Sequence, residues 1–228
     1  MRLTQRVKAL VPEAAKSRMK VDRARAFRRF GSDRYCYPAL NRLDRQMIER
    51  LPATGVFLEI GANDGYSQSN TFALETLYGW RGILIEPLPR HYEKCRKVRT
   101  NSECFNVACA SQPGEVVLDD SNLTSVALGL QDKAEEASRL HSGRLVTVPA
   151  VTLSSVIDRS SFSRVDFLSI DVEGAELEVL QGLDLDRHLP DFLLVETKHP
   201  EAVSDLLGRR LKLTESLSFH DYLWTSED

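Results

Sequence analysis

The chain has 228 residues, of which 42% are hydrophobic and 28% charged, and its formal net charge is −3. This composition is ordinary for a globular protein and excludes a collagen-like, low-complexity or fully disordered chain. No apolar stretch approaches the roughly 18 residues that a transmembrane helix needs, and the N-terminus lacks the apolar segment of a secretory signal. We therefore expect a cytoplasmic protein whose four cysteines are reduced thiols.

Charge is distributed unevenly along the chain. Residues 1–50 contain 14 Lys and Arg against 5 Asp and Glu, whereas the remainder contains 16 against 28. We interpret residues 1–50 as a basic helical extension and residues 51–228 as the main domain. The extension either packs on its own acidic domain or contacts an anionic partner, such as a membrane surface or an acidic acceptor. The acidic domain argues against nucleic acid as a partner.

The basic extension is predicted to be helical. Two short helices broken near Pro12 account for residues 1–30, and the segment 30–33 is predicted to be a loop. A further helix is expected to begin at Pro38 and to carry an apolar face. The residues of that face are Leu40, Leu43, Met47, Ile48 and Leu51.

From residue 56 onward, short apolar strands alternate with helices. Strands are expected at 56–60, 82–86, 104–108, 116–118, 145–153, 167–170, 192–195, 211–214 and 222–225. Helices are expected at 71–78, 89–99 and 175–180, with a charged helix or lid at 131–142. Continuous apolar strands separated by helices indicate a doubly wound α/β fold with a mostly parallel sheet. The last two strands are close enough in sequence to form an antiparallel hairpin.

The turn after the first strand is the first candidate binding element, because ligands of doubly wound sheets bind at the carboxyl ends of the strands. Gly61, Asn63 and Gly65 tolerate left-handed backbone conformations. Glu59 and Asp64 add negative charge to this turn. These acids would repel the pyrophosphate of NAD, but they suit the ammonium and sulfonium groups of S-adenosylmethionine, which we favour as the ligand.

Glu86 is the second candidate, because it ends the next predicted strand, 21 residues beyond Gly65. A carboxylate at this position can accept hydrogen bonds from both ribose hydroxyls, as in dinucleotide-binding folds. The glycine turn and the acid together predict a nucleoside site.

These motifs resemble those of the FkbM family of S-adenosylmethionine-dependent methyltransferases. The resemblance covers about residues 55–225 in a consistent order. It rests on Arg99 and on EIGANDG at 59–65, SNT at 69–71, GWRGILIEPLP at 79–89, NVACAS at 106–111, TLSSVI at 152–157, FLSIDVEGAELEVLQGL at 167–183 and LLVE at 193–196.

The resemblance implies a Rossmann-like, seven-stranded sheet with strand order 3-2-1-4-5-7-6 and an antiparallel last strand. It implies that the segment 59–65 holds the methionine part of the donor and that Glu86 holds the ribose. Asn106 and Ala108 would border the adenine, and Asp171 would lie beside the methyl group.

Carboxylates near the later strands are the candidates for catalysis, because transfer to an alcohol is helped by a general base or a metal. Asp171 and Glu173 follow one buried strand and Glu196 ends the next, so the three could meet in one cleft. One interpretation makes Asp171 the base while Glu173 orients the acceptor. Another is a magnesium site, and Glu173 could instead cap the following helix. His220, in the turn of the last hairpin, is expected to be structural.

The leading hypothesis is an O-methyltransferase acting on a hydroxyl of a sugar, glycan or small metabolite. One alternative is a non-catalytic adaptor that keeps the fold and works through its basic arm. A second alternative is a nicotinamide-dependent oxidoreductase, against which Asp64 and the absence of a third glycine in the turn argue.

Overall fold

The central feature of the fold is a twisted seven-stranded sheet, seen in a computed structural model that describes residues 13–119, 127–128, 145–172 and 174–226. Its strands are β1 (Val56–Ile60), β2 (Arg81–Ile85), β3 (Glu103–Phe105), β8 (Phe167–Ile170), β9 (Phe192–Glu196), β10 (Lys212–Ser216) and β11 (Asp221–Thr225). They are ordered β10-β11-β9-β8-β1-β2-β3, which is the expected order 3-2-1-4-5-7-6. All neighbouring pairs are parallel except those that involve β11, so the predicted fold class is confirmed.

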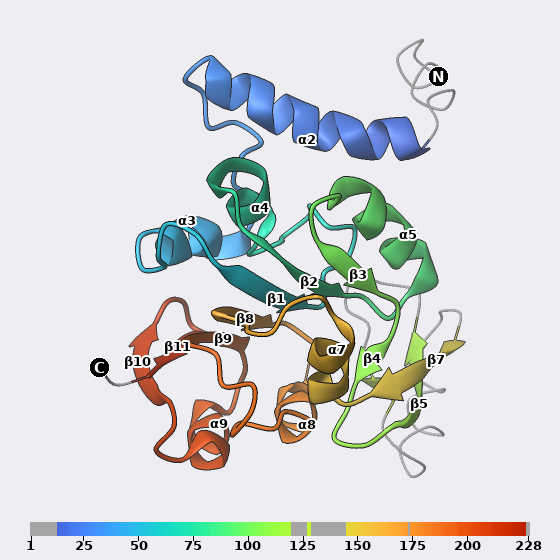
Figure 1. Cartoon of the computed structure of the whole chain (residues 1–228), viewed down its shortest axis with the longest axis vertical. Coiled ribbons are helices and arrows are strands. Elements are labelled where there is room, and N and C mark those ends of the chain that lie inside the picture. The colour runs from blue at the N-terminus through green and yellow to red at the C-terminus, as the bar shows by residue number, and fades with distance from the viewer. Residues whose placement is uncertain (1–12, 120–126, 129–144, 173, 227–228) are drawn as a thin grey trace.

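Helices cover both faces of this sheet (Figure 1). The helices are α3 (Leu43–Ile48), α4 (Phe72–Tyr78) and α5 (Pro89–Val98) on one face, and α7 (Leu153–Arg159), α8 (Glu176–Gln181) and α9 (Pro200–Leu207) on the other. Alternate side chains of β1 serve the two faces, because Phe57 packs in the cluster of α3 and α4 while Leu58 packs in that of α7, α8 and α9. Both faces are therefore buried, which explains the continuous apolar strands.

A second, smaller sheet lies beside the carboxyl edge of the first. It has the order β4-β7-β5-β6 and consists of β4 (Ala108–Cys109), β5 (Gly114–Asp119), β6 (Ala127–Leu128) and β7 (Leu145–Val151). The single strand predicted at 104–108 is therefore wrong, because β3 and β4 belong to different sheets. The chain turns at Asn106, whose side-chain amide donates to the carbonyls of Glu86 and Pro87.

The basic extension packs on the main domain through α2 (Glu13–Arg29), which lies across α4 and α5 (Figure 1). Ala24 is buried in a cluster with Phe72 and Val98. Lys20 makes an ion pair with Asp64 of the turn that follows β1. Of the two expectations for this arm, packing on its own domain is thus observed. The first of its two predicted helices lies outside the described residues.

The segment that follows α2 departs from prediction. The helix expected from Pro38 is divided into a 3-10 turn at Leu40–Arg42 and α3, and Asn41 and Arg42 have positive φ angles of 49° and 59°. Because of this break Leu40 is 52% exposed instead of sharing the buried face of Leu43 and Met47.

Two helices, α7 and α9, were not predicted from the sequence, and one predicted element is not described. The strand expected at 145–153 stops at Val151 because Thr152 caps α7, accepting a hydrogen bond from the amide of Ser155. The helix or lid expected at 131–142 lies outside the described residues. The final hairpin of β10 and β11 is antiparallel, as expected.

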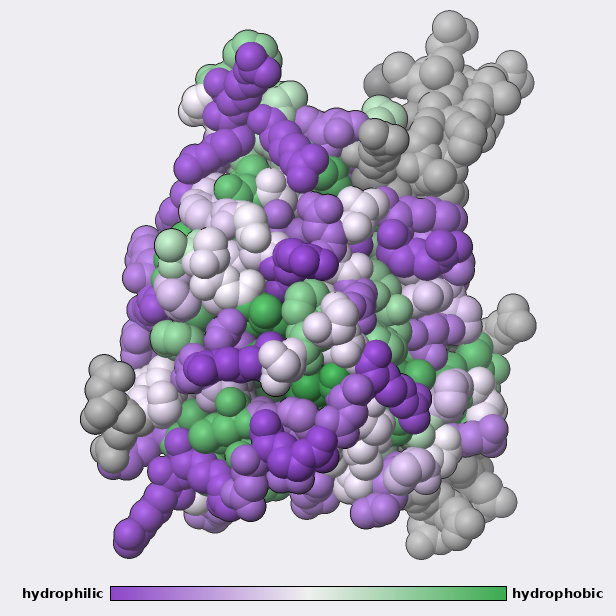
Figure 2. Space-filling model, viewed as in Figure 1, coloured by the Kyte–Doolittle hydropathy of each residue, from purple (hydrophilic) through white to green (hydrophobic). Residues whose placement is uncertain are grey.

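The surface combines many charged side chains with scattered apolar ones. Hydrophilic residues cover much of the face shown in Figure 2, and hydrophobic ones show in patches near its middle. Among the described helices, none combines the length and apolar character that a membrane span requires. All four cysteines are free thiols.

Candidate active site

A cavity opens at the carboxyl ends of β1, β2 and β8, where the sequence predicted the ligand to bind. The second sheet supplies one wall through Val116 and Leu118, and α8 borders the cavity through Val179 and through Ala175, which directly precedes the helix. The cavity therefore has an apolar side beside the second sheet and a polar side at the strand ends.

The cavity brings together most of the predicted site residues. Those that line it are Glu59, Gly61, Asn63, Glu86, Ala108 and Asp171. Asp64, Gly65 and Asn106 do not line it, and Glu173 lies outside the described residues. Predicted residues from four separate parts of the sequence thus converge at one edge of the sheet.

Glu86 is buried at the cavity and held in a defined orientation. Its Oε2 accepts the backbone amide of Asn63 at 2.8 Å, and its Oε1 accepts that of Leu88, also at 2.8 Å. Two amides on a carboxylate stabilise its charged form. Asn63 can present its amide in this way because it adopts a left-handed conformation with φ of 49°.

Gly61 is required for packing between strands. Its φ is +85°, and a Cβ atom at this position would lie 2.0 Å from the carbonyl oxygen of Asp171. The glycine therefore lets the turns after β1 and β8 approach each other closely, and this contact helps to position Asp171 at the cavity.

Glu59 lines the cavity but also organises the loop that precedes α4. It accepts hydrogen bonds from the hydroxyls of Ser69 and Thr71 at 2.9 and 2.7 Å and from the amide of Asn70 at 2.7 Å. Fully buried Arg99 donates to Glu59 at 3.4 Å. Both carboxylate oxygens of Glu59 thus accept hydrogen bonds from this loop. The contacts explain why an acid at position 59 occurs together with the SNT segment at 69–71.

Asp64 is directed away from the cavity, towards α2. Its carboxylate pairs with Lys20 and accepts the amides of Tyr66 and Ser67 at 3.0 and 2.7 Å. Burial raises the pKa of this carboxyl, but Lys20 and the two amides outweigh burial, so the pKa lies below its usual range. The negative charge of Asp64, which in the sequence favoured a cationic ligand, is therefore balanced by Lys20.

The other two residues that do not line the cavity have structural contacts. Asn106 makes the turn between β3 and β4. Gly65 has φ of +77°, and a Cβ atom there would lie within 2.9 Å of Arg99 and 3.0 Å of Cys95. Its glycine permits α5 to pack against the turn after β1.

Two cavity residues were missed by the sequence reasoning. Asn70 is buried, and its Oδ1 has no hydrogen-bond partner among the described residues, while its Nδ2 donates to Ser169 at 3.1 Å. His91 on α5 is buried and its Nδ1 contacts Oδ1 of Asn63. Asn70 follows Glu59 by 11 positions and His91 lies on a helix, so no local spacing indicated that both reach one cavity.

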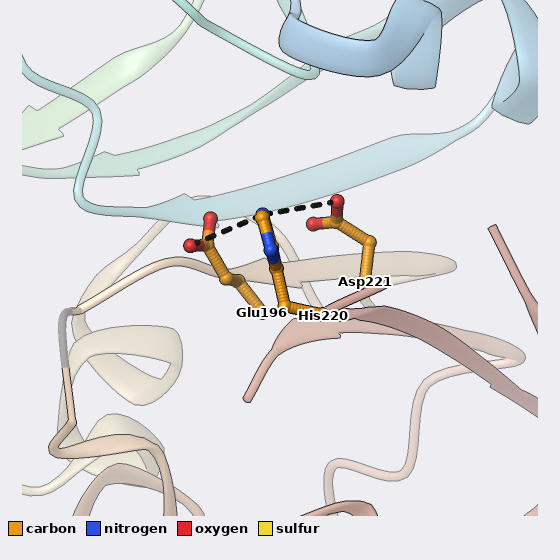
Figure 3. Close-up of side chains that lie close together, drawn as sticks. All are labelled: Glu196, His220 and Asp221. Carbon is orange, nitrogen blue, oxygen red and sulfur yellow. Dashed lines mark ion pairs between the residues drawn. The ribbon is translucent and has the colours of Figure 1, made fainter. Parts of the chain in front are cut away.

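Glu196, the third carboxylate of the predicted cleft, does not line this cavity. It lies with His220 and Asp221 at the end of β9 and the start of β11 (Figure 3). Of the three carboxylates predicted to meet around a magnesium ion, Asp171 lines the cavity and Glu196 does not. Glu173 lies outside the described residues, so the three-carboxylate magnesium site stays a prediction. Strand register explains the position of Glu196 in part, because Glu196 is paired across the sheet with Asp221.

Comparison with known proteins gives a family match. The sequence model of the Methyltransferase FkbM domain matches residues 59–220. No curated protein sequence is detectably similar to the chain.

Several solved structures resemble the chain at low sequence identity. A TehB-like SAM-dependent methyltransferase from Corynebacterium glutamicum is 12% identical, with 93% of this chain and 99% of that chain covered and a TM-score of 0.44. An O-methyltransferase from Bacillus cereus in complex with SAH is 13% identical, with 95% and 92% covered and a TM-score of 0.46. A putative O-methyltransferase from Klebsiella pneumoniae is 13% identical, with 98% and 96% covered and a TM-score of 0.46.

Proposed function

The chain belongs to the FkbM methyltransferase family, and from this premise we propose that it transfers the methyl group of S-adenosylmethionine to a hydroxyl of a sugar, glycan or small metabolite. The observation that carries the proposal is the position of Glu86, which is buried at the cavity with both carboxylate oxygens oriented by backbone amides. The acceptor class comes from the family resemblance, and the experiments below address it separately.

The residues of the cavity fit this donor. Glu86 would accept the ribose hydroxyls, since an ionised carboxylate is an acceptor only. Asn70 offers a buried carbonyl oxygen without a partner among the described residues, which suits the ammonium of the methionine part. Ala108 and Leu118 offer apolar surface for the adenine ring. The donor, once bound, supplies an electrophilic methyl group.

Asp171 is the candidate base in this proposal. It lines the cavity directly after β8, and its backbone amide donates to the carbonyl of Ile60 at 3.2 Å. A carboxylate there would accept the proton that an acceptor hydroxyl loses on methylation. Alignment of the acceptor against the donor accounts for much of the remaining rate. Magnesium is not part of this proposal, because a general base at Asp171 needs no cation.

The setting of the reaction remains an expectation. Four free thiols suit a reducing compartment, and we propose the cytoplasm. Arg25 and Arg29 are exposed four positions apart on α2, and exposed Phe30 follows the helix directly; we propose this end of the basic extension as the candidate for contact with an anionic surface.

Calorimetric titration with S-adenosylmethionine, its demethylated product and NAD tests the donor assignment. We expect the first two to bind and NAD not to bind. Glu86→Ala should weaken donor binding by about 1–3 kcal/mol, the cost of leaving charge-assisted hydrogen bonds unmade. Glu93→Ala is the matched control, because Glu93 is exposed on α5 and pairs with Arg96. Equal donor affinity in folded Glu86→Ala and the parent would contradict the ribose assignment.

A screen of hydroxylated acceptors tests the reaction. Transfer of labelled methyl from the donor to an acceptor oxygen is the expected result. Donor binding without transfer to any sugar, glycan or metabolite hydroxyl would favour the adaptor alternative instead.

A further inference from the structure

A second constellation of polar side chains lies outside the donor cavity, at the same carboxyl edge of the sheet. It consists of Glu196 at the end of β9, Asp221 at the start of β11, and His220 directly before it. Glu196 and Asp221 are cross-strand partners in the antiparallel pair of β9 and β11. Figure 3 shows the imidazole of His220 between the two carboxylates.

The distances within this constellation are too long for direct hydrogen bonds. His220 Nε2 lies 3.5 Å from Oε1 of Glu196 and 3.6 Å from Oδ2 of Asp221. One potential ligand atom from each residue lies within 4.8 Å of the others. Ligands about 2.0–2.2 Å from a tetrahedral zinc ion are roughly 3.3–3.6 Å apart. The two distances from His220 therefore match those between atoms that share a cation.

An ordinary histidine–carboxylate pair elsewhere in the chain shows the contrast. His188 Nε2 lies 3.1 Å from Oδ1 of Asp158, within hydrogen-bonding distance, and Asp158 also pairs with Arg187. His220 has instead two carboxylates at nearly equal and longer distances, and among the described residues no Lys or Arg is paired with Asp221.

The ligand atoms are held by the surrounding structure. Asp221 is buried, and its Oδ2 accepts hydrogen bonds from Asn41 and from the hydroxyl of Ser218. The backbone carbonyl of His220 accepts the amide of Thr197 at 2.8 Å, which ties the hairpin turn to the end of β9. Hydrogen-bonded carboxylates of this kind are typical of the surroundings of metal ligands.

We propose that Glu196, His220 and Asp221 form a binding site for a divalent transition-metal cation, for which zinc is the best match. One imidazole and two carboxylates are zinc ligands, and three protein ligands leave one position open, as in zinc sites that bind a water or a substrate. Carboxylate ligands alone would favour magnesium or calcium, whereas the imidazole favours a transition metal.

The place of the site suggests what the open position contacts. Ile170 and Val195 are register partners in β8 and β9, so Asp171 and Glu196 follow them side by side at the sheet edge. The cation would thus lie next to the candidate base and could hold an acceptor oxygen. This last role, unlike cation binding itself, rests on the proposed methyl transfer.

The experiment is a calorimetric titration of the EDTA-treated full chain with zinc chloride, with manganese and magnesium chlorides as comparisons. We expect one zinc equivalent to bind, more tightly than magnesium. His220→Ala and Glu196→Gln should each weaken zinc binding at least tenfold, whereas His188→Ala should not change it. Circular dichroism shows whether each variant is folded. If His220→Ala does not fold, the proposal is tested with Glu196→Gln, because the Glu196 side chain is partly exposed and its substitution should leave the fold intact.

Absence of stoichiometric zinc binding, or zinc affinity that is equal in the parent, His220→Ala and Glu196→Gln, would overturn the proposal. The same preparations are titrated with S-adenosylmethionine. Zinc binding without donor binding contradicts the proposed function and supports the cation site. Donor binding without zinc binding supports the proposed function and contradicts the cation site.

Discussion

At the scale of single residues, the donor cavity is defined by side chains whose orientation the backbone controls. Glu86 is directed by two amides, and Asn63 can supply one of them only through a left-handed conformation. Asp171 reaches the same cavity because Gly61 allows the turns after β1 and β8 to touch. The chemistry of the site therefore depends on positions where the main chain adopts unusual geometry.

Asp171→Asn tests the candidate base, since asparagine keeps the shape of the side chain but loses its charge and basicity. We expect turnover to fall by about a hundredfold or more, which is the scale of general-base catalysis. The measurement is methyl transfer to the acceptor that the screen identifies, accompanied by donor titration. Normal turnover in a folded variant would show that the carboxylate is structural, and weaker donor binding would identify it as a donor contact.

Asp64→Asn separates the two acids of the turn after β1. Because Asp64 faces Lys20 and not the cavity, we expect donor affinity to stay within about twofold of the parent. Stability should fall by about 1 kcal/mol or less, as for a partly exposed ion pair. Calorimetry and urea unfolding measure the two quantities. A large loss of donor affinity would contradict this assignment and show that Asp64 contributes to donor binding.

At the scale of elements, Arg99 joins the end of α5 to α4 and to the loop that precedes α4. It is fully buried and pairs with Glu75 at 2.8 Å and with Glu59 at 3.4 Å, and it also donates to Thr71. Burial disfavours its charge, but the two carboxylates outweigh burial and raise the pKa of the guanidinium. This arginine connects the packing of α5 to the loop that carries Asn70.

Arg99→Ala should therefore destabilise the fold by about 3–5 kcal/mol, since it leaves two buried carboxylates without their partner. Arg96→Ala on the same helix is the matched control. Arg96 pairs with Glu93 on the surface, where solvent screens the pair, so its loss should leave stability close to that of the parent. Urea unfolding of both variants measures the difference. Similar stabilities for the two variants would contradict the role assigned to Arg99.

Asp44 in the first turn of α3 gives a pH-dependent contribution to stability. Burial raises the pKa of its carboxyl to about 6, although the amides of Ala39 and Arg45 oppose the shift. Between the unfolded pKa near 4 and the folded pKa, the native state binds the extra proton. The contribution of Asp44 to the free energy of unfolding is thus fully present below about pH 4 and is lost as the pH rises towards 6.

Asp44→Asn isolates this effect, because it removes the titration and keeps one oxygen that can accept an amide. We expect the stability of the variant, relative to the parent, to rise between pH 4 and pH 7 by up to about 3 kcal/mol. Urea unfolding across this range is the measurement. A difference between the two proteins that does not change with pH would show that Asp44 titrates normally.

At the scale of the whole molecule, the site spans both layers of the structure. The main sheet supplies the polar residues of the cavity and the second sheet supplies an apolar wall. A ligand that fills the cavity contacts turns that follow β1, β2 and β8 together with β5 of the second sheet. Donor binding should therefore stabilise the entire domain and not one loop alone.

We expect a hundredfold excess of donor over its dissociation constant to add about 2.7 kcal/mol to stability. For a domain of this size that corresponds to a rise in Tm of roughly 5–10 °C. Thermal unfolding with S-adenosylmethionine, its demethylated product and NAD is the measurement, and NAD should leave Tm unchanged. A comparable rise with NAD would favour the oxidoreductase alternative.

The sequence by itself determined the central sheet and the general place of the site. Short apolar runs bounded by turn residues, as at β1, β2, β8 and β9, are typical of strands buried on both faces, and parallel strands direct their carboxyl ends to one edge. Glu59, Glu86 and Asp171 stand at those ends, so their convergence could be predicted from local pattern. The family resemblance extended this prediction to the full strand order, which the observed topology matches.

Only the tertiary structure decided which way each polar side chain faces. Asp64 and Glu59 belong to the same turn, yet Asp64 pairs with α2 from the start of the chain, which no local pattern relates to it. Asn70 and His91 reach the cavity through packing of a loop and a helix, and Glu196 finds its neighbours through pairing with β11. Contacts between distant segments set these orientations, because a buried polar group turns to the partner that tertiary packing brings near it.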